Sequence, residues 1–70
     1  MIQDGATNVD QAKNDGATPL YVAAQEGFTE IVKLLITEGK ADVDKAENDG
    51  ATPLYIAAQE GNAEVVELLV

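Results

Sequence analysis

Apolar and polar residues alternate in blocks along the chain, and the first apolar block has the flanking residues of a short helix. It is the run LYVAA, which begins directly after Thr18-Pro19 and is followed closely by Gly27. Threonine is a favoured N-cap, proline fits the first helical position, and glycine accepts the left-handed conformation that ends a helix. The pattern therefore predicts a helix from Leu20 to about Glu26.

The next apolar block has the spacing of a helix with one wide apolar face. Between Glu30 and Ile36, apolar residues stand at positions i, i+1, i+3, i+4 and i+5, and Lys33 lies on the other side with Glu30. This spacing is typical of an amphipathic helix. We expect that helix to end by Gly39 and to be followed by a polar loop with a single apolar residue, Val43.

Both blocks occur twice, with a period of 34 residues. Residues 14–27 return as residues 48–61, and the only change is Ile56 in place of Val22. A second amphipathic helix is expected over residues 64–70. Self-similarity at such a period is the signature of a solenoid, in which each unit buries its apolar face against the next.

The residues before the first full unit also align with the repeat. The aligned pairs are Ile2 with Ile36, Gly5 with Gly39, Val9 with Val43, and Asp10 with Asp44. We therefore predict one array, with the tail of a preceding repeat (1–13), a first full repeat (14–47) and a second, truncated repeat (48–70). Because repeat proteins usually need about three units for stability, we interpret the chain as a fragment of a longer array or as an engineered minimal one.

The repeated motif resembles the ankyrin repeat. Its letters are T-P-L-Y-x-A-A-x-x-G, then E-[I/V]-V-x-L-L, and in the first unit G-x-A-D-V-D, whereas ankyrin repeats carry T-P-L-H with a period of about 33 residues. The resemblance covers the whole chain and implies an all-α fold, an ankyrin-type α-solenoid of helix-turn-helix repeats joined by β-turn or hairpin loops. Two features depart from the family: Tyr21 and Tyr55 replace the usual His, and Lys40 looks like one inserted residue after Gly39.

Small and aliphatic residues of both units are expected to form the interior. The paired alanines leave little bulk on the first helix of each unit, so a neighbouring helix can approach closely. The expected interior residues are Leu20, Ala23, Ala24, Leu34, Leu35, Val43, Leu54, Ala57, Ala58, Leu68 and Leu69.

Charge and composition narrow the choice of partner. The chain has thirteen acidic residues and four lysines, so its net charge is −9. Such a chain repels nucleic acid and anionic membranes, and a partner selected by charge would be basic. There is no cysteine, no apolar run near the ~18 residues of a membrane span, and no signal peptide, so we expect a cytoplasmic protein.

Residue types for catalysis and metal binding are scarce. Histidine, cysteine and serine are absent, so the usual nucleophile–base pairs cannot form. Carboxylate pairs such as Glu26 and Glu30 recur in both units on a convex turn, which favours a solvated acidic face. The loop from Asp42 begins like a calcium loop, but Ala46 and Glu47 stand where an oxygen ligand and a glycine are needed. We expect no enzyme activity, no cofactor and no specific metal site.

The resemblance implies that a partner is bound by the turn tips and by the exposed face of the first helix. The corresponding residues are Asn14, Asp15, Ala17, Tyr21, Gln25 and Glu26, with Asn48, Asp49, Ala51, Tyr55, Gln59 and Glu60 in the second unit. The two sets are identical, which favours a repetitive ligand, a generic acidic spacer, or a designed or recently duplicated sequence. Tyr21 and Tyr55 are amphipathic and are either anchors or partly buried packing residues. Phe28, matched by Asn62, either covers the edge of the second helix or is a lone exposed contact.

Two functions of different classes remain open. The first is a non-enzymatic protein–protein interaction module that recruits a protein partner through a basic or extended segment. The alternative is a structural or engineered minimal solenoid with no dedicated ligand. In that case the first helix pair has no predecessor and the run Leu68-Leu69-Val70 is unmasked. We then expect self-association through uncapped ends, either end to end or as a back-to-back dimer.

Overall fold

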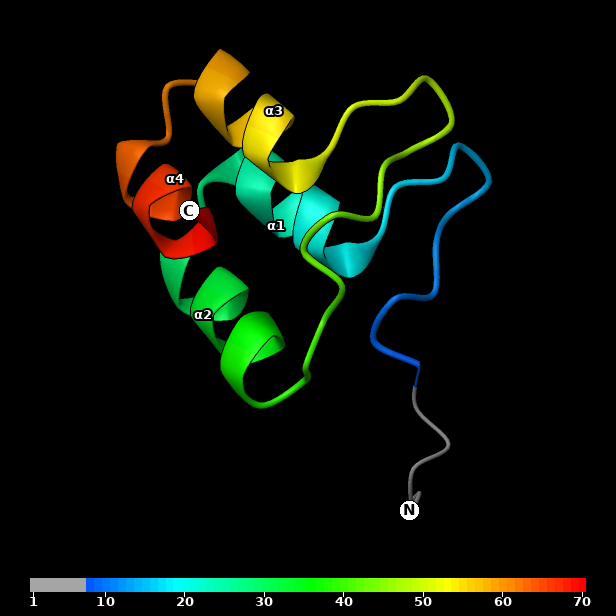
Figure 1. The fold of residues 1–70 in the computed structure, drawn as a ribbon, viewed down its shortest axis with the longest axis horizontal. Helices are drawn as coiled ribbons and strands as arrows, with labels where there is room; N and C mark the ends of the chain where they lie inside the picture. The colour runs from blue at the N-terminus through cyan, green and yellow to red at the C-terminus, as the bar shows by residue number, and fades with distance from the viewer. Residues whose placement is uncertain (1–7) are drawn as a thin grey trace.

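The computed structural model describes residues 8–70, which form four short helices and no strand. In chain order the helices are α1 (Pro19–Glu26), α2 (Thr29–Thr37), α3 (Pro53–Gln59) and α4 (Ala63–Leu69) (Figure 1). Within this part of the chain, no helix has the length and apolar character needed to cross a membrane. The predicted alignments of Ile2 and Gly5 lie outside the described residues.

Each unit is a pair of helices, and the two pairs stack side by side. α1 packs against α2 and α3 against α4, while the pairs meet through α1 against α3 and α2 against α4 (Figure 1). The turns that precede α1 and α3 project together away from the helices, on the right of this view. The arrangement confirms the expected all-α solenoid of helix pairs.

The first helix of each pair begins as the sequence predicts. Thr18 has an extended backbone, and its Oγ1 accepts a hydrogen bond from the N–H of Tyr21 at 3.2 Å. Thr52 caps α3 in the same way and accepts from the N–H of Tyr55 at 3.1 Å. Gly27 closes α1 with φ 75°, in the left-handed region that suits glycine. Because a cap satisfies an N–H that the helix itself cannot, both starts are sharply defined.

Two tight turns precede the helix pairs, and the second is hydrogen-bonded to the first. Gly16 has φ 87°, and its N–H donates to the carbonyl of Lys13 at 2.9 Å. The N–H of Asn48, in the second turn, donates to the carbonyl of Asp15 at 3.0 Å. A Cβ on Gly16 would lie 2.6 Å from the backbone nitrogen of Asn48, so glycine is required for the turns to approach this closely.

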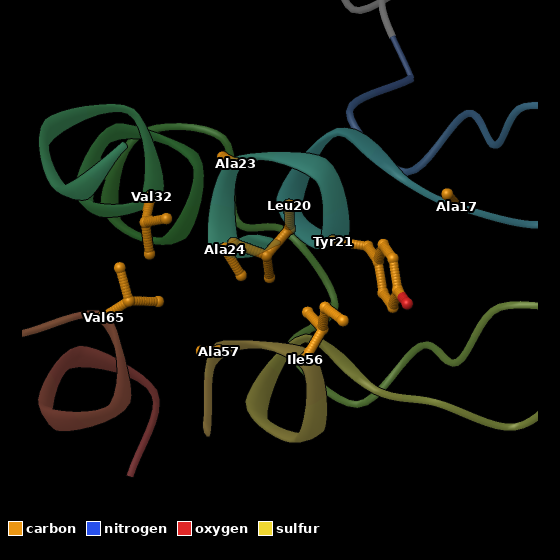
Figure 2. Packing of buried hydrophobic residues seen from close by; sticks show 9 residues of the cluster. All are labelled: Ala17, Leu20, Tyr21, Ala23, Ala24, Val32, Ile56, Ala57 and Val65. Carbon is orange, nitrogen blue, oxygen red and sulfur yellow. The ribbon is translucent and has the colours of Figure 1, made fainter. Parts of the chain in front are cut away.

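The core lies between the two helix pairs (Figure 2). Its buried apolar residues are Ala17, Leu20, Tyr21, Ala23, Ala24, Val32, Ile56, Ala57 and Val65. Val32 of α2 and Val65 of α4 point toward each other at one end of this cluster. The predicted burial of Leu20, Ala57 and the first alanine pair is confirmed.

Part of the predicted interior is wrong. The residues that are exposed instead are Leu34 (58%), Leu54 (38%), Leu68 (36%) and Ala58. Those that are only partly buried against the core are Leu35, Val43 and Leu69. Each helix turns one side toward the other pair and one side away from it, so an apolar residue is buried only when it lies on the inner side.

Lys40, the residue that looks like an insertion in the sequence, helps to close α2. Lys40 has φ 55°, the one positive φ of a non-glycine residue within residues 8–70, and its Nζ donates to the carbonyl of Thr37 at 3.2 Å. The N–H of Gly39 donates to the carbonyl of Leu34 at 3.0 Å. The chain therefore leaves the helix through Gly39 as predicted, and Lys40 supplies the left-handed residue.

Candidate functional site

The turn tips carry a strip of exposed polar side chains, namely Asn14, Asp15, Asn48 and Asp49. Oδ1 of Asp15 accepts from the N–H of Ala17 at 3.0 Å, and Oδ1 of Asp49 accepts from the N–H of Ala51 at 3.1 Å. These bonds hold each carboxylate at its tip. Oδ2 of Asp15 lies 3.9 Å from Nζ of Lys13, in an ion pair that is exposed on both sides and therefore weak.

Asn48 fixes the two tips relative to each other. Its N–H donates to the carbonyl of Asp15 at 3.0 Å, and its Nδ2 donates to the carbonyl of Asn14 at 3.1 Å. The four exposed turn residues therefore form one continuous strip.

The helix-end residues of the predicted surface lie apart from the turn tips. They are exposed at the C-terminal ends of α1 and α3, and they are Gln25, Glu26, Gln59 and Glu60. At 1.5 Å per residue, α1 is about 12 Å long, and the turn tips project beyond its start, so the two groups lie farther apart than this length. Asn62 connects the units at this end, because its Nδ2 donates to the carbonyls of Ala24 at 2.8 Å and Gln25 at 3.1 Å.

Two residues of the predicted surface are not accessible. Ala17 and Tyr21 are only 3% and 7% exposed, so neither side chain lies on the exposed surface, and of the two alternatives for Tyr21 the buried packing role holds. The second unit covers them, whereas nothing in the described chain covers the second unit in turn. Their counterparts are accordingly more open: Ala51 is half-buried and Tyr55 is 61% exposed.

Glu47, which was not among the residues predicted for the binding surface, lies beside the turn tips. Burial and then a hydrogen bond with Glu47 raise the pKa of Tyr21 to about 12. A hydrogen bond with Asp49 raises the pKa of Glu47, and the same bond lowers the pKa of Asp49. Comparison of the two repeats could have pointed to this residue. Glu47 stands where the first unit has Lys13, so the charge differs directly before two nearly identical stretches. Residues 8–70 contain no group of three or more acidic side chains placed to hold a metal ion.

The end of the molecule beyond α3 exposes residues whose counterparts in the first unit are buried. Leu54 and Tyr55 are 38% and 61% exposed, whereas Leu20 and Tyr21 are 0% and 7% exposed. Ala58 is exposed as well. Leu54, Tyr55 and Ala58 are named the C face here. An open hollow at this end is lined by Ala58, Gly61, Asn62, Ala63, Val66 and Glu67.

The opposite end exposes the other half of the same contact. Ile31 is 47% exposed, whereas its counterpart Val65 is 1% exposed. Two further pairs behave alike, namely exposed Pro19 with buried Pro53, and half-buried Val22 with buried Ile56. The three residues Pro19, Val22 and Ile31 are named the N face here.

Comparison with known proteins gives one family. A family model described as ankyrin repeats (3 copies) matches residues 1–70. A search of curated proteins gave no match. Ankyrin repeats are in general non-enzymatic protein–protein interaction modules. With its capped helix pairs, linked turns and full-length match, the chain belongs to the ankyrin repeat family.

Proposed function

We propose that this chain binds an extended, basic segment of a partner protein along its turn tips. The observation that carries the proposal is the pair of hydrogen bonds from Asn48, which hold two identical acidic tips in register. Asp15 and Asp49 are exposed at equivalent positions of these tips. The net charge of −9 draws basic partners in from solution and speeds their association.

A ligand with regularly spaced basic side chains fits this surface best. Because the two tips are identical, two lysines or arginines of one segment can each meet the same environment. The helix-end group offers an extension of the surface. An extended chain covers about 3.3 Å per residue, so more than about four residues are needed to reach from a turn tip to Glu26 or Glu60.

The test is a titration with a fluorescent oligolysine peptide, followed by anisotropy. The variant is the double change Asp15→Asn and Asp49→Asn, because asparagine keeps the Oδ1 acceptor of each turn. Exposed ion pairs contribute about 0.2–1 kcal/mol each, so we expect binding to weaken roughly 2- to 30-fold with unchanged helical circular dichroism.

The matched control is the double change Glu38→Gln and Glu67→Gln, which removes the same charge from exposed positions away from the turns. It should weaken binding less. An equal loss in both variants would mean that only net charge attracts the peptide, and the turn-tip proposal would be abandoned.

Self-association is the second function that we propose. It is supported by the apolar residues of the C and N faces, which are buried at the equivalent positions of the other unit. Like charges on two copies oppose contact, so association should strengthen as salt screens them. Sedimentation velocity at rising protein and salt concentration tests this. A chain that stays monomeric and folded at millimolar concentration in high salt does not self-associate.

A further inference from the structure

We infer that a second copy of this chain covers the C face with its N face, in the head-to-tail register that already joins the two units of one chain. The inference rests on the self-association proposed above and specifies its geometry. A head-to-tail contact uses two different surfaces and does not by itself close into a ring. The product is therefore a growing solenoid and not a symmetric dimer.

The contact between the units supplies the template for this register. In Figure 2, Leu20 and Ala24 of α1 face α3, and Val32 faces Val65 across the same interface. Leu20, Ala24 and Val32 are each 0% exposed, and Val65 is 1% exposed. The interface is thus a buried apolar contact between the inner side of the first unit and the inner side of the second.

A shift of 34 residues maps this template onto the open ends. Leu54 and Ala58 correspond to Leu20 and Ala24, and Ile31 of a second copy corresponds to Val65. All three are exposed here, Ile31 to 47%. The second copy would therefore place Ile31 against Ala58 and Val66, in the place that Val65 takes in the first contact. The open faces continue an interface that the molecule already makes.

Two glycines show that positions filled by asparagine side chains at the internal contact are open at the second unit. A Cβ on Gly16 or Gly27 would meet the side chain of Asn48 or Asn62, respectively. At the equivalent positions, Gly50 and Gly61, an added Cβ would meet no other atom of residues 8–70 within 4 Å. In the proposed register, Asn14 of the second copy occupies the place at Gly50. It can then donate to the carbonyls of Asn48 and Asp49, as Asn48 donates to those of Asn14 and Asp15.

Charge favours this register over contacts between like faces. At the internal contact, Glu47 approaches Tyr21 among the carboxylates of both turns. At the proposed junction, Lys13 of the second copy stands in the place of Glu47. It faces the Tyr55 hydroxyl and the turn that carries Asp49. A positive charge thus meets an acidic tip, whereas a contact between two N faces or two C faces brings like surfaces together.

The decisive experiment blocks one face at a time. Ile31→Lys places a charge on the N face, and Ala58→Lys places a charge and bulk on the C face. Burying an unpaired charge is costly. Each lysine also lowers the net negative charge, so loss of association cannot come from added repulsion. In sedimentation velocity, we expect each variant alone to be monomeric. An equimolar mixture should form a dimer and stop there, because one intact N face meets one intact C face.

The matched control is Gln25→Lys, which adds the same charge at a position that is exposed in both units. It should associate like the unmodified chain. Circular dichroism confirms that each variant is folded. If Ile31→Lys or Ala58→Lys unfolds the chain, Pro19→Lys or Tyr55→Lys replaces it, since Pro19 is an exposed residue of the N face and Tyr55, of the C face, is 61% exposed.

The outcomes separate this inference from the function on which it rests. If the unmodified chain never associates, self-association itself fails. If it associates but one of the two blocked variants still dimerises alone, the contact joins like faces and the head-to-tail register is wrong. If both variants are monomeric and their mixture is as well, the two faces do not meet and the register is also wrong.

Phe28 provides a gain-of-function test of the same register. It is 50% exposed and stands where the second unit has Asn62, whose Nδ2 donates to two carbonyls of the first unit. The matching carbonyls of Ala58 and Gln59 receive no side-chain donor within residues 8–70. Phe28→Asn should supply one from the second copy and tighten association about tenfold, which corresponds to about 1.4 kcal/mol. Unchanged or weaker association would place Phe28 away from the junction and overturn the register.

Discussion

Leu20 and Leu54 are the same residue in the same motif, yet one is 0% exposed and the other 38%. The difference comes entirely from the neighbouring unit, which covers the first leucine and leaves the second open. The same holds for Tyr21 and Tyr55. For these pairs, the position of the residue relative to the next unit decides how far its side chain is buried, and the residue type does not.

The two leucines give a matched pair of stability variants. Leu20→Ala removes a buried side chain and should cost about 2–5 kcal/mol. Leu54→Ala removes a side chain that still contacts water and should cost clearly less. Urea unfolding followed by circular dichroism measures both. Equal costs would show that the C face is covered in solution, and repeating the measurement at low protein concentration separates coverage by a second copy from an error in the fold.

Tyr21 should show its environment on titration with base. Its pKa is raised from 10.0 to about 12 by burial and by Glu47, so the folded state favours the neutral phenol. This contribution to stability is present below about pH 10 and is lost as pH rises through 12. With Tyr55→Phe as background, absorbance at 295 nm should report phenolate formation near pH 12 in the folded chain and near pH 10 in urea. Titration near 10 in both solvents would contradict the burial.

The helices were largely predictable at the level of elements, because their signals are local. Thr18-Pro19 and Gly27 fix α1 within the chain segment that carries them, and the amphipathic spacing placed α2 within one residue at either end. Burial was less predictable. Leu34 and Val32 lie on the same apolar face in the sequence, but only contact with α4 decides that Val32 is buried and Leu34 is not.

The turn tips of the candidate site were predictable for the same local reason, since Asp-Gly specifies the turn at each tip. The burial of Ala17 and the approach of Glu47 to Tyr21 depend on the adjacent unit. A single repeat motif contains no information on which of its sides is covered.

The two N-caps should differ in strength although their sequence is identical. The side chain of each threonine accepts a hydrogen bond from the third residue of its helix, but Thr18 is 1% exposed and Thr52 is half-buried. Loss of an N-cap costs about 0.5–2 kcal/mol. We expect the cost of Thr18→Ala to lie at the upper end of this range and that of Thr52→Ala at the lower end. A buried N–H that loses its partner cannot form a replacement hydrogen bond with water. Equal urea midpoints for the two variants would contradict this prediction.

The whole molecule should unfold as one unit. The core is made by residues of both helix pairs, with Leu20 and Val32 from the first and Ile56 and Val65 from the second. Neither pair buries its inner side alone. A chain ending at residue 47 should therefore lose helical circular dichroism, while residues 1–70 show one cooperative transition. A helical 1–47 chain would mean that the first unit is stable without the second.

The difference in exposure between identical stretches makes the chain its own reference for spectroscopy. Residues 14–27 and 48–61 share every residue except Val22 and Ile56, so local sequence contributes equally to the NMR chemical shifts of each equivalent pair. The remaining difference in chemical shift between two equivalent residues mostly reports whether a neighbouring unit covers them. When any molecule binds to the C face, the chemical shifts of Tyr55 and Ala58 should move toward those of Tyr21 and Ala24. The size of that movement would measure how closely the new contact copies the old one.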